Sequence, residues 1–301
     1  GAGSNKELTP NGTSAEGGAN SAGFGYISAF NSDGYSWTAG STNTENFNKS
    51  SQTYANWCWK AGTSFTNDAS ATSIGTIDSA GSVSDTSGFS IVTYTAAGAA
   101  ATIKHGLSSA PKMIFTRKLN GSPNWGVYYG DPTDYLELNT TAATQDDANM
   151  WNDTAPTSSV FSVGGDNKSS GGGNYVAYCF AEKKGYSKFG TYTGNDDDDG
   201  AFVYTGFKPA FVMVKITAGQ TDNWIMQDNK INSFNGASSQ RLRPNSSGAE
   251  FSSSNEIDLL SNGFKTHGAD GEINGSGFSY IYMAFAESPF VTSTGIPTTA
   301  R

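Results

Sequence analysis

Histidine is scarce in this sequence, which limits the catalytic chemistry open to it. Only His105 and His267 occur among the 301 residues. They fall at different positions of the internal repeat described below, whereas a repeated active site would repeat its base. A Ser-His-Asp arrangement stays open on residue type, but no serine lies in a nucleophile-elbow motif. The sequence therefore predicts a protein that is not an enzyme.

Clustered basic residues and long apolar runs are also missing. The 18 lysines and arginines are scattered along a chain with a net charge of −9, whereas a phosphate-binding surface needs a basic patch or stripe. We therefore expect no nucleic-acid partner. Because no run of about 18 apolar residues occurs, we expect no membrane-spanning segment either.

Cysteine is limited to Cys58 and Cys179, too few for a disulfide scaffold or a four-cysteine zinc site. The two occupy the same position in successive copies of the repeat, and Ala284 fills it in the third copy. We therefore expect a small buried residue at each place. A disulfide is not expected, because equivalent sites in stacked units rarely bring their Cα atoms within about 7 Å.

Glycine, small polar residues and aromatic residues are what the sequence has in quantity. There are 37 glycines, and 13% of the residues are aromatic, which is more than disordered chains carry. Asn-Gly and Asp-Gly pairs supply the positive φ angles of tight hairpins, and no segment shows a capped 3.6-residue period. The pattern predicts an all-β chain of tandem antiparallel β-sandwich or flattened-barrel repeats with Gly/Ser/Asn-rich turns.

The chain repeats itself. Residues 175–182, which read YVAYCFAE, correspond to residues 280–287, which read YIYMAFAE. Upstream, Asn124-Trp125 corresponds to Asn223-Trp224, and several further landmarks keep the same order. Such a series indicates two complete units that share one strand order. We place unit two at residues 88–183 and unit three at 184–291, followed by a C-terminal tail at 292–301.

A partial copy precedes these units. Residues 54–59, which read YANWCW, match the two segments above, and Leu8-Thr9-Pro10-Asn11 matches residues 242–245 and, more loosely, 136–139. Residues 1–60, unit one, therefore read as the second half of a repeat without its first half. Because an uncovered aromatic strand is an aggregation site, we expect completion by residues before Gly1, by another chain, or by residues 61–87. These last residues are otherwise a linker or strap.

Several motifs resemble a recurrent module of bacteriophage proteins, especially marine ones. The runs that carry the resemblance are residues 152–164, 175–182, 186–195, 202–207, 280–286 and the closing stretch 289–301. Such modules occur toward the C-terminus of long proteins usually labelled tail fibre or lectin-like. The resemblance covers residues 50–301 and implies a virion protein, but it supplies no activity.

Four consecutive carboxylates form the sharpest charged feature. Asp196, Asp197, Asp198 and Asp199 could bind Ca²⁺ through oxygen ligands, although their spacing is not the alternating pattern of an EF-hand. The competing interpretation is a solvated hairpin tip that blocks edge-to-edge aggregation. No other cofactor is expected.

Two loops are candidates for ligand binding, because they differ most from their counterparts in the other unit. The candidate residues are Asp146, Asp147, Trp151, Asp153 and Asn195. Loops on a rigid β-scaffold commonly carry recognition, and polar loops suit polyhydroxyl ligands. Trp125 and Trp224 could also stack on sugars, but their equivalence favours a core or interface role.

Taken together, these features predict a non-enzymatic structural protein of the phage virion, a fibre-like appendage that adheres to host-surface glycans. Its expected partners are copies of itself, preferably as a trimer, and other virion proteins. The alternatives are a carbohydrate-binding module of a secreted or cell-surface protein and a capsid decoration protein. A glycan-degrading enzyme is least favoured, since it needs paired carboxylates in a cleft and no such pair recurs between units.

Overall fold

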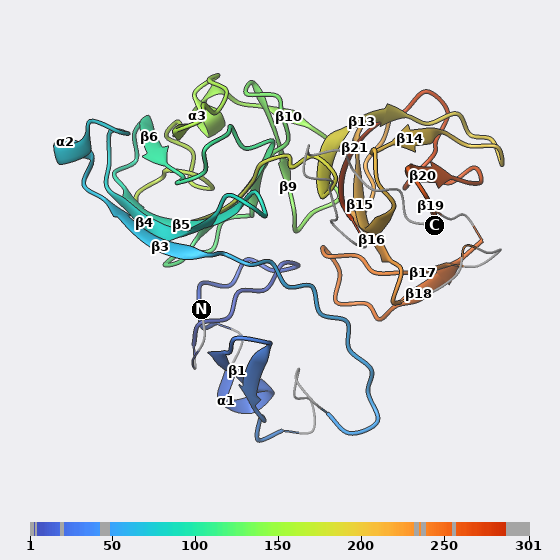
Figure 1. Cartoon of the computed structure of the whole chain (residues 1–301), viewed down its shortest axis with the longest axis horizontal. Helices are drawn as coiled ribbons and strands as arrows, with labels where there is room; N and C mark the ends of the chain where they lie inside the picture. The colour runs from blue at the N-terminus through green and yellow to red at the C-terminus, as the bar shows by residue number, and fades with distance from the viewer. Residues whose placement is uncertain are drawn as a thin grey trace.

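The chain is all-β, as the sequence predicts (Figure 1). The computed structural model describes residues 3, 5–18, 21–42, 49–231, 235, 239–254 and 257–286. Every strand pairing in this part of the chain is antiparallel, the sheets stay open rather than closing into a barrel, and each helix is a single turn of four residues. Short strands follow from the dense turn signals, because each turn limits the length of its neighbours.

Unit two consists of a large sheet and a small second layer. Its elements are β5 (Phe89–Ala96), β6 (Ala101–Lys104), β7 (Met113–Lys118), β8 (Gly126–Tyr128), β9 (Asp134–Glu137), β10 (Gln145–Asp146), α3 (Ala148–Trp151), β11 (Val160–Val163) and β12 (Gly173–Phe180). The large sheet has the order β10-β9-β8-β7-β12-β5-β4-β3, where β3 is Thr63–Asn67 and β4 is Ser79–Ser84. In the second layer β11 pairs with β6. Between the layers lies an apolar core that includes Tyr94, Phe161 and Tyr175.

Residues 61–87, expected from the sequence to be a linker or strap, contribute strands to that sheet. They form β3 (Thr63–Asn67), α2 (Ala69–Thr72) and β4 (Ser79–Ser84), and β4 pairs with β5 along six residues of each strand. Asp68 begins α2 by accepting a hydrogen bond from the Ala71 amide, as an N-cap does. The segment therefore widens unit two rather than lying loose between units.

Unit three repeats this topology. Its strands are β13 (Ser187–Thr193), β14 (Phe202–Tyr204), β15 (Pro209–Ala218), β16 (Ile225–Asp228), β17 (Ser239–Arg241), β18 (Phe251–Ser253), β19 (Ile257–Leu260), β20 (Gly263–Thr266) and β21 (Ser279–Ala286). β21 lies between β13 and β15, as β12 lies between β5 and β7, and β20 pairs with β14 as β11 pairs with β6. The repeat therefore fixes the strand order of both units.

Equivalent side chains make equivalent contacts in the two complete units. The rings of Tyr94 and Tyr175 stack with a centroid distance of 5.4 Å, and those of Tyr192 and Tyr280 stack at 4.9 Å. In both units the first tyrosine also meets a phenylalanine of the second layer edge-on, at 5.9 Å. Such aromatic pairs add about 1 kcal/mol each beyond the area they bury.

Unit one is smaller, and its described residues contain no counterpart of the strands that open the other units. It contains α1 (Ser21–Phe24), β1 (Tyr26–Phe30) and β2 (Tyr35–Thr38), and β1 pairs with β2 around the Asp33-Gly34 turn. This hairpin corresponds to β19 and β20 of unit three. Figure 1 shows it below the two larger units, while the segment that leads to β3 runs past it as coil.

The three units meet in one aromatic cluster. Trp59, Phe180 and Phe285 occupy the same position in the three copies, and their ring centroids lie 5.8, 5.4 and 6.0 Å apart. Phe89 and Phe211 pack around them. A position that repeats in sequence and converges in space defines an approximate threefold arrangement within one chain.

A repeated hydrogen bond links neighbouring units. The indole N–H of Trp125 in unit two donates to the Thr9 carbonyl of unit one at 3.0 Å. The indole of Trp224 in unit three donates to the Glu137 carbonyl of unit two at 2.9 Å. Thr9 and Glu137 are equivalent, so the two interfaces are the same contact made twice. Both tryptophans are buried, which confirms the core or interface role favoured by the sequence.

The cysteines show how the environment of one repeat position differs between units. Cys179 is fully buried, and burial raises the pKa of its thiol to about 12. Cys58 is exposed, so the expectation of a buried residue is wrong there. The reason is that β5 and β7 flank Cys179, whereas no strand of the described residues flanks Cys58. Both thiols are free, as expected.

The central cluster should carry much of the stability that joins the units. We expect Trp59→Ala to lower the free energy of unfolding by about 3 kcal/mol, because it removes contacts with four phenylalanines of two units. Urea denaturation with fluorescence detection measures this change. Phe30→Ala, at an aromatic residue that is 67% exposed, is the control and should stay within about 0.5 kcal/mol of the parent chain. Equal effects of the two substitutions would contradict a shared core.

Candidate functional site

An exposed aromatic pair lies on the outer layer of unit three. On β14, Val203 points into the core, whereas Phe202 and Tyr204 on either side are 50% and 64% exposed. The pleat forces this alternation. Across the strand, Phe202 pairs with Lys265 and Tyr204 with Gly263 of β20. A large exposed apolar side chain is more informative than a buried one, and two on one face mark a contact surface.

The aromatic pair is specific to unit three. Ile103 of β6 pairs with Phe161 as Val203 pairs with Phe264, which aligns Thr102 and Lys104 with Phe202 and Tyr204. The buried position is thus apolar in both units, whereas the outward positions differ. The scaffold can tolerate this difference because the outward side chains do not touch the core.

The acidic turn stands beside this face. Asn195 and Asp197 organise it: the Asn195 amide donates to the Asp199 carbonyl at 3.1 Å, and the Asp197 carboxylate accepts from the Asp199 amide at 2.8 Å. Asp199 forms an ion pair with Lys265, and hydrogen bonding and attraction by Lys265 lower the pKa of this carboxyl. All five side chains from Asn195 to Asp199 are exposed. The turn and β14 together form what we call the edge site, Asn195–Tyr204 with Lys265.

The carboxylates of the turn are not gathered around a common point. Among the described residues no group of three or more His, Cys, Asp or Glu side chains could hold a metal ion. The backbone of Asp196 is left-handed at φ +58°, and all four carboxylates are exposed to solvent. The Ca²⁺ hypothesis for Asp196, Asp197, Asp198 and Asp199 therefore gains no geometric support.

His267 lies under the turn and helps to hold it. Its Nδ1 lies 2.8 Å from the Asp198 carbonyl oxygen and its Nε2 lies 2.9 Å from Oδ2 of Asp258. Both ring nitrogens face acceptors, so neither offers a lone pair to a substrate. The imidazole connects β19 and β20 to the acidic turn, a structural contact that sequence reasoning missed.

The candidate residues of unit two do not form a second surface site. Trp151 is only 1% exposed and meets Tyr128 edge-on at 5.6 Å, so the expectation that it contacts a ligand is wrong; α3 turns this apolar ring into the core. Asp147 caps α3 by accepting from the Asn149 amide at 2.9 Å. Asp146 pairs with Asp134 on the sheet edge, and Asp153 is exposed after the helix.

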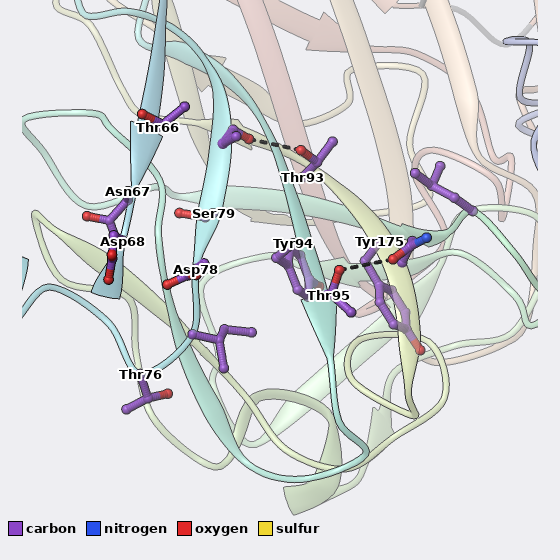
Figure 2. A pocket seen from close by; sticks show the side chains of 14 residues that line it. Thr66, Asn67, Asp68, Thr76, Asp78, Ser79, Thr93, Tyr94, Thr95 and Tyr175 are labelled. Carbon is purple, nitrogen blue, oxygen red and sulfur yellow. Dashed lines mark hydrogen bonds between the residues drawn. The ribbon is translucent and has the colours of Figure 1, made fainter. Parts of the chain in front are cut away.

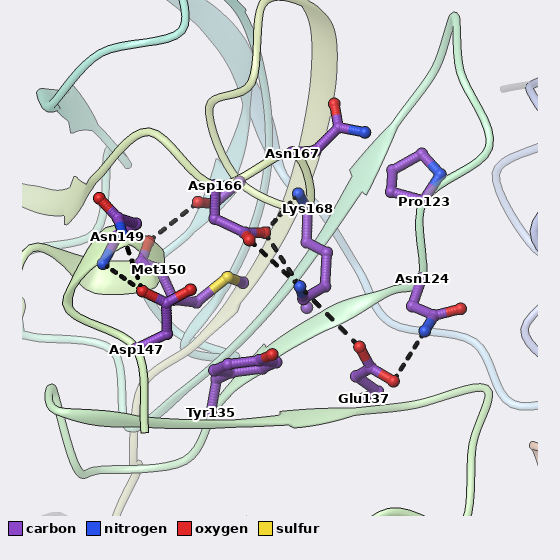
Figure 3. A network of polar contacts seen from close by, with 12 residues as sticks. Pro123, Asn124, Tyr135, Glu137, Asp147, Asn149, Met150, Asp166, Asn167 and Lys168 are labelled. Atoms are coloured by element: carbon purple, nitrogen blue, oxygen red, sulfur yellow. Dashed lines mark hydrogen bonds and ion pairs between the residues drawn. The ribbon is translucent and has the colours of Figure 1, made fainter. Parts of the chain in front are cut away.

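A polar network next to α3 stabilises unit two (Figure 3). Lys168 lies between Asp166 and Glu137, at 3.1 and 3.9 Å, and above the Tyr135 ring at 4.7 Å. In unit three the equivalent pair is Glu272 and Arg243, with the charges exchanged between the two positions. Both units thus keep an ion pair at these two positions although the positive and negative residues are exchanged. This indicates that the attraction between the two side chains is what matters, which favours a structural over a catalytic role.

An open hollow of about 920 Å³ lies at one end of the unit-two sheet (Figure 2). Several of its polar groups already form hydrogen bonds within the protein. Asp78 accepts from the Ala69 amide at 2.8 Å, Thr93 donates to the Ala80 carbonyl at 3.1 Å, and Thr95 donates to Asn174 at 3.0 Å. The Tyr94 and Tyr175 rings in its wall are buried. A ligand there would find few free partners, so the edge site is the stronger candidate.

Repetition, open antiparallel sheets and a shared core define the class: an all-β protein built from tandem units. The chain belongs to the family described as domain of unknown function (DUF7483), which it matches over residues 2–289. Searches of curated proteins and of solved structures found no match. In the described part of the chain, no helix has the length and apolarity to cross a membrane.

His105 should make the fold sensitive to acid. The buried ring accepts a hydrogen bond from the Leu107 amide at Nδ1 and lies 3.1 Å from the Thr157 carbonyl oxygen at Nε2, the pattern of a neutral imidazole. Burial lowers the pKa of His105 from 6.5 to about 4. Between pH 6.5 and about pH 4, His105 is therefore protonated in the unfolded chain but neutral in the folded chain. Stability present above pH 6.5 is lost as pH falls, by at most about 3 kcal/mol.

His105→Gln should flatten this dependence. Glutamine has no proton to gain in that range, so the difference in unfolding free energy between pH 7 and pH 4.5 should shrink, even if the variant is less stable at pH 7. Urea denaturation at a series of pH values gives both numbers. A slope unchanged from the parent chain would assign the acid sensitivity to other groups.

Proposed function

We propose that this protein is a non-enzymatic structural component of a bacteriophage virion, a fibre-like appendage that adheres to host-surface glycans through the edge site. The observation that carries the proposal is the exposed pair Phe202 and Tyr204 beside a polar turn on a braced sheet. Aromatic faces stack on the apolar faces of sugar rings, and amide and carboxylate groups hydrogen-bond to their hydroxyls.

The rigidity of the edge site supports a recognition role. β14 pairs with β20, which pairs with β19, and the turn is held by Lys265 and by the ring of His267. A site whose backbone is fixed loses less conformational entropy when a ligand binds. The edge site thus combines exposed binding groups with a preorganised frame.

The virion assignment rests on the motif resemblance, which spans residues 50–301. The repeat architecture agrees with a structural role, since tandem units extend a particle surface without requiring a cleft. The proposal includes assembly with other virion proteins and with further copies of this chain, with a trimer as the preferred state.

Adhesion should depend on the aromatic pair. We expect Phe202→Ala with Tyr204→Ala to weaken binding to host cells or an arrayed glycan at least tenfold, which is about 1.4 kcal/mol, because both stacking surfaces disappear. Flow cytometry with labelled protein, or a glycan array, measures the loss. The melting temperature should barely change, since both side chains lie outside the core.

A matched control separates recognition from general surface stickiness. Phe30→Ala removes an aromatic ring of comparable exposure from unit one and should leave binding unchanged. Replacing Asp196, Asp197 and Asp198 by serine tests the turn, and we expect weaker binding with an unchanged fold. Full adhesion by the aromatic double variant would refute the edge site, and sugar release by the parent chain would refute the non-enzymatic assignment.

Self-assembly and location are tested on purified material and on particles. Sedimentation at micromolar concentration should give a trimer, and antibodies against the chain should label a projecting structure in electron micrographs of the virion. A stable monomer that labels no particle would contradict both the assembly and the virion assignment.

A further inference from the structure

The segment Tyr54–Lys60 corresponds in sequence to the central strands of the other two units, but it is coil in this structure. Its equivalents β12 and β21 are each paired on both sides, β12 with β5 and β7, and β21 with β13 and β15. In the described part of the chain no strand pairs with residues 54–60. The Lys60 carbonyl accepts a hydrogen bond from the Ser87 hydroxyl at 3.0 Å, and no backbone-to-backbone bond between described residues involves residues 54–60.

Only one face of this segment is covered. Trp57 and Trp59 pack on the shared core, and the Trp57 indole donates to Oδ2 of Asp228 at 2.7 Å. The opposite face, with Tyr54 and Cys58, is exposed. The equivalent residues of the other units, Tyr175, Cys179, Tyr280 and Ala284, are all buried.

A second vacancy lies one step around the threefold arrangement. Unit two binds unit one through the Trp125 indole and the Thr9 carbonyl, and unit three binds unit two through the Trp224 indole and the Glu137 carbonyl. The corresponding carbonyl of unit three is that of Arg243. It accepts a bond from the Ser246 amide as the Thr9 carbonyl does from the Gly12 amide, so the turn is the same and the oxygen keeps a second lone pair.

Asn11 points to the same missing piece. In the complete units the equivalent Asn139 and Asn245 accept the backbone N–H of the tryptophan, at 2.9 and 3.1 Å. Each also donates to the preceding asparagine at 2.8 Å. Among the described residues, the Asn11 side chain makes no hydrogen bond, because the Asn-Trp pair of its own unit is not there.

We propose that the open face of unit one is a binding slot for one further first half of the repeat. Its two strands would pair with both edges of Tyr54–Lys60, and its Asn-Trp pair would engage Asn11 and donate the indole N–H to the Arg243 carbonyl. The added half would then occupy the place that the first halves of units two and three occupy in their own units, and all three units of the approximate threefold arrangement would be complete.

The occupant is a first half of the repeat rather than a second copy of this chain. In both complete units the first half directly precedes the second half along the chain. A second copy of this chain has no first half to spare within its described residues, because β5, β7, β13 and β15 are all paired in their own units. We therefore assign the slot to a segment that has the sequence pattern of a first half, with its two strands and its Asn-Trp pair.

Cys58 reports on the slot and Cys179 is its internal control. In the 301-residue chain we expect a maleimide to modify Cys58 quickly under native conditions, whereas Cys179 reacts only after unfolding. Amide hydrogen exchange should be fast at residues 54–60 and slow at residues 175–180. Protection of residues 54–60 or of Cys58 would show that the face is already covered and would overturn the proposal. Protection that rises with protein concentration would assign the face to a second copy instead.

An added half-repeat should close the slot. Leu8 aligns with Leu136, so a copy of residues 88–128 can be placed directly ahead of Gly1. We expect this extension to slow the modification of Cys58 about 100-fold, because access would require local opening. The matched control carries Trp125→Ala in the added copy only and should protect Cys58 less. An extension that leaves the labelling rate of Cys58 unchanged overturns the proposal, whether the added copy folds or not.

Discussion

The contact between Trp59, Phe180 and Phe285 is the constraint on which the rest of the fold depends. Phe180 and Phe285 project from the central strands β12 and β21, and Trp59 projects from the coil segment of unit one. Placing the three rings together therefore fixes how the two large sheets and unit one meet. The face of each large sheet that carries these rings is buried in the common core. The small second layer of each unit therefore packs on the opposite face. The two-layer units and their shared centre follow from this one arrangement.

The repeat made the strand order and the position of the core readable from the sequence. Aromatic runs such as Tyr175–Phe180 predict a strand covered on both faces, and both faces of β12 are covered. The sequence did not show that residues 61–87 join the sheet of unit two. Their Ser, Thr and Gly composition resembles a linker, and β4 gains its place through backbone pairing with β5 rather than through apolar side chains. Composition carries little information about such pairing.

The candidate site was predicted only in part, and the reason lies in packing. The Asn195–Asp199 turn could be recognised because it differs from its counterpart and is rich in charge. Phe202 and Tyr204 could not, since an aromatic residue within a strand is more often buried, and only the position of Val203 in the core shows that its neighbours face outward. The prediction for Trp151 was wrong in the opposite direction. Its turn-rich sequence suggested an exposed ring, whereas the single helical turn α3 places the ring in the core.

The comparison between units separates what the scaffold requires from what it leaves free. The stacked tyrosines join neighbouring strands of one sheet, and the Asn-Trp pair is bonded within its own unit. The indole-to-carbonyl contact joins two units. All three recur because each fixes the placement of a strand or of a unit. The pair formed by Glu137 and Lys168 reappears as Arg243 and Glu272 with its charges exchanged, so what is retained there is complementarity rather than a particular residue. On the outward face of β14 and β6 neither identity nor chemistry is retained. New recognition can arise on that face at little cost in stability, because no neighbouring unit depends on its side chains.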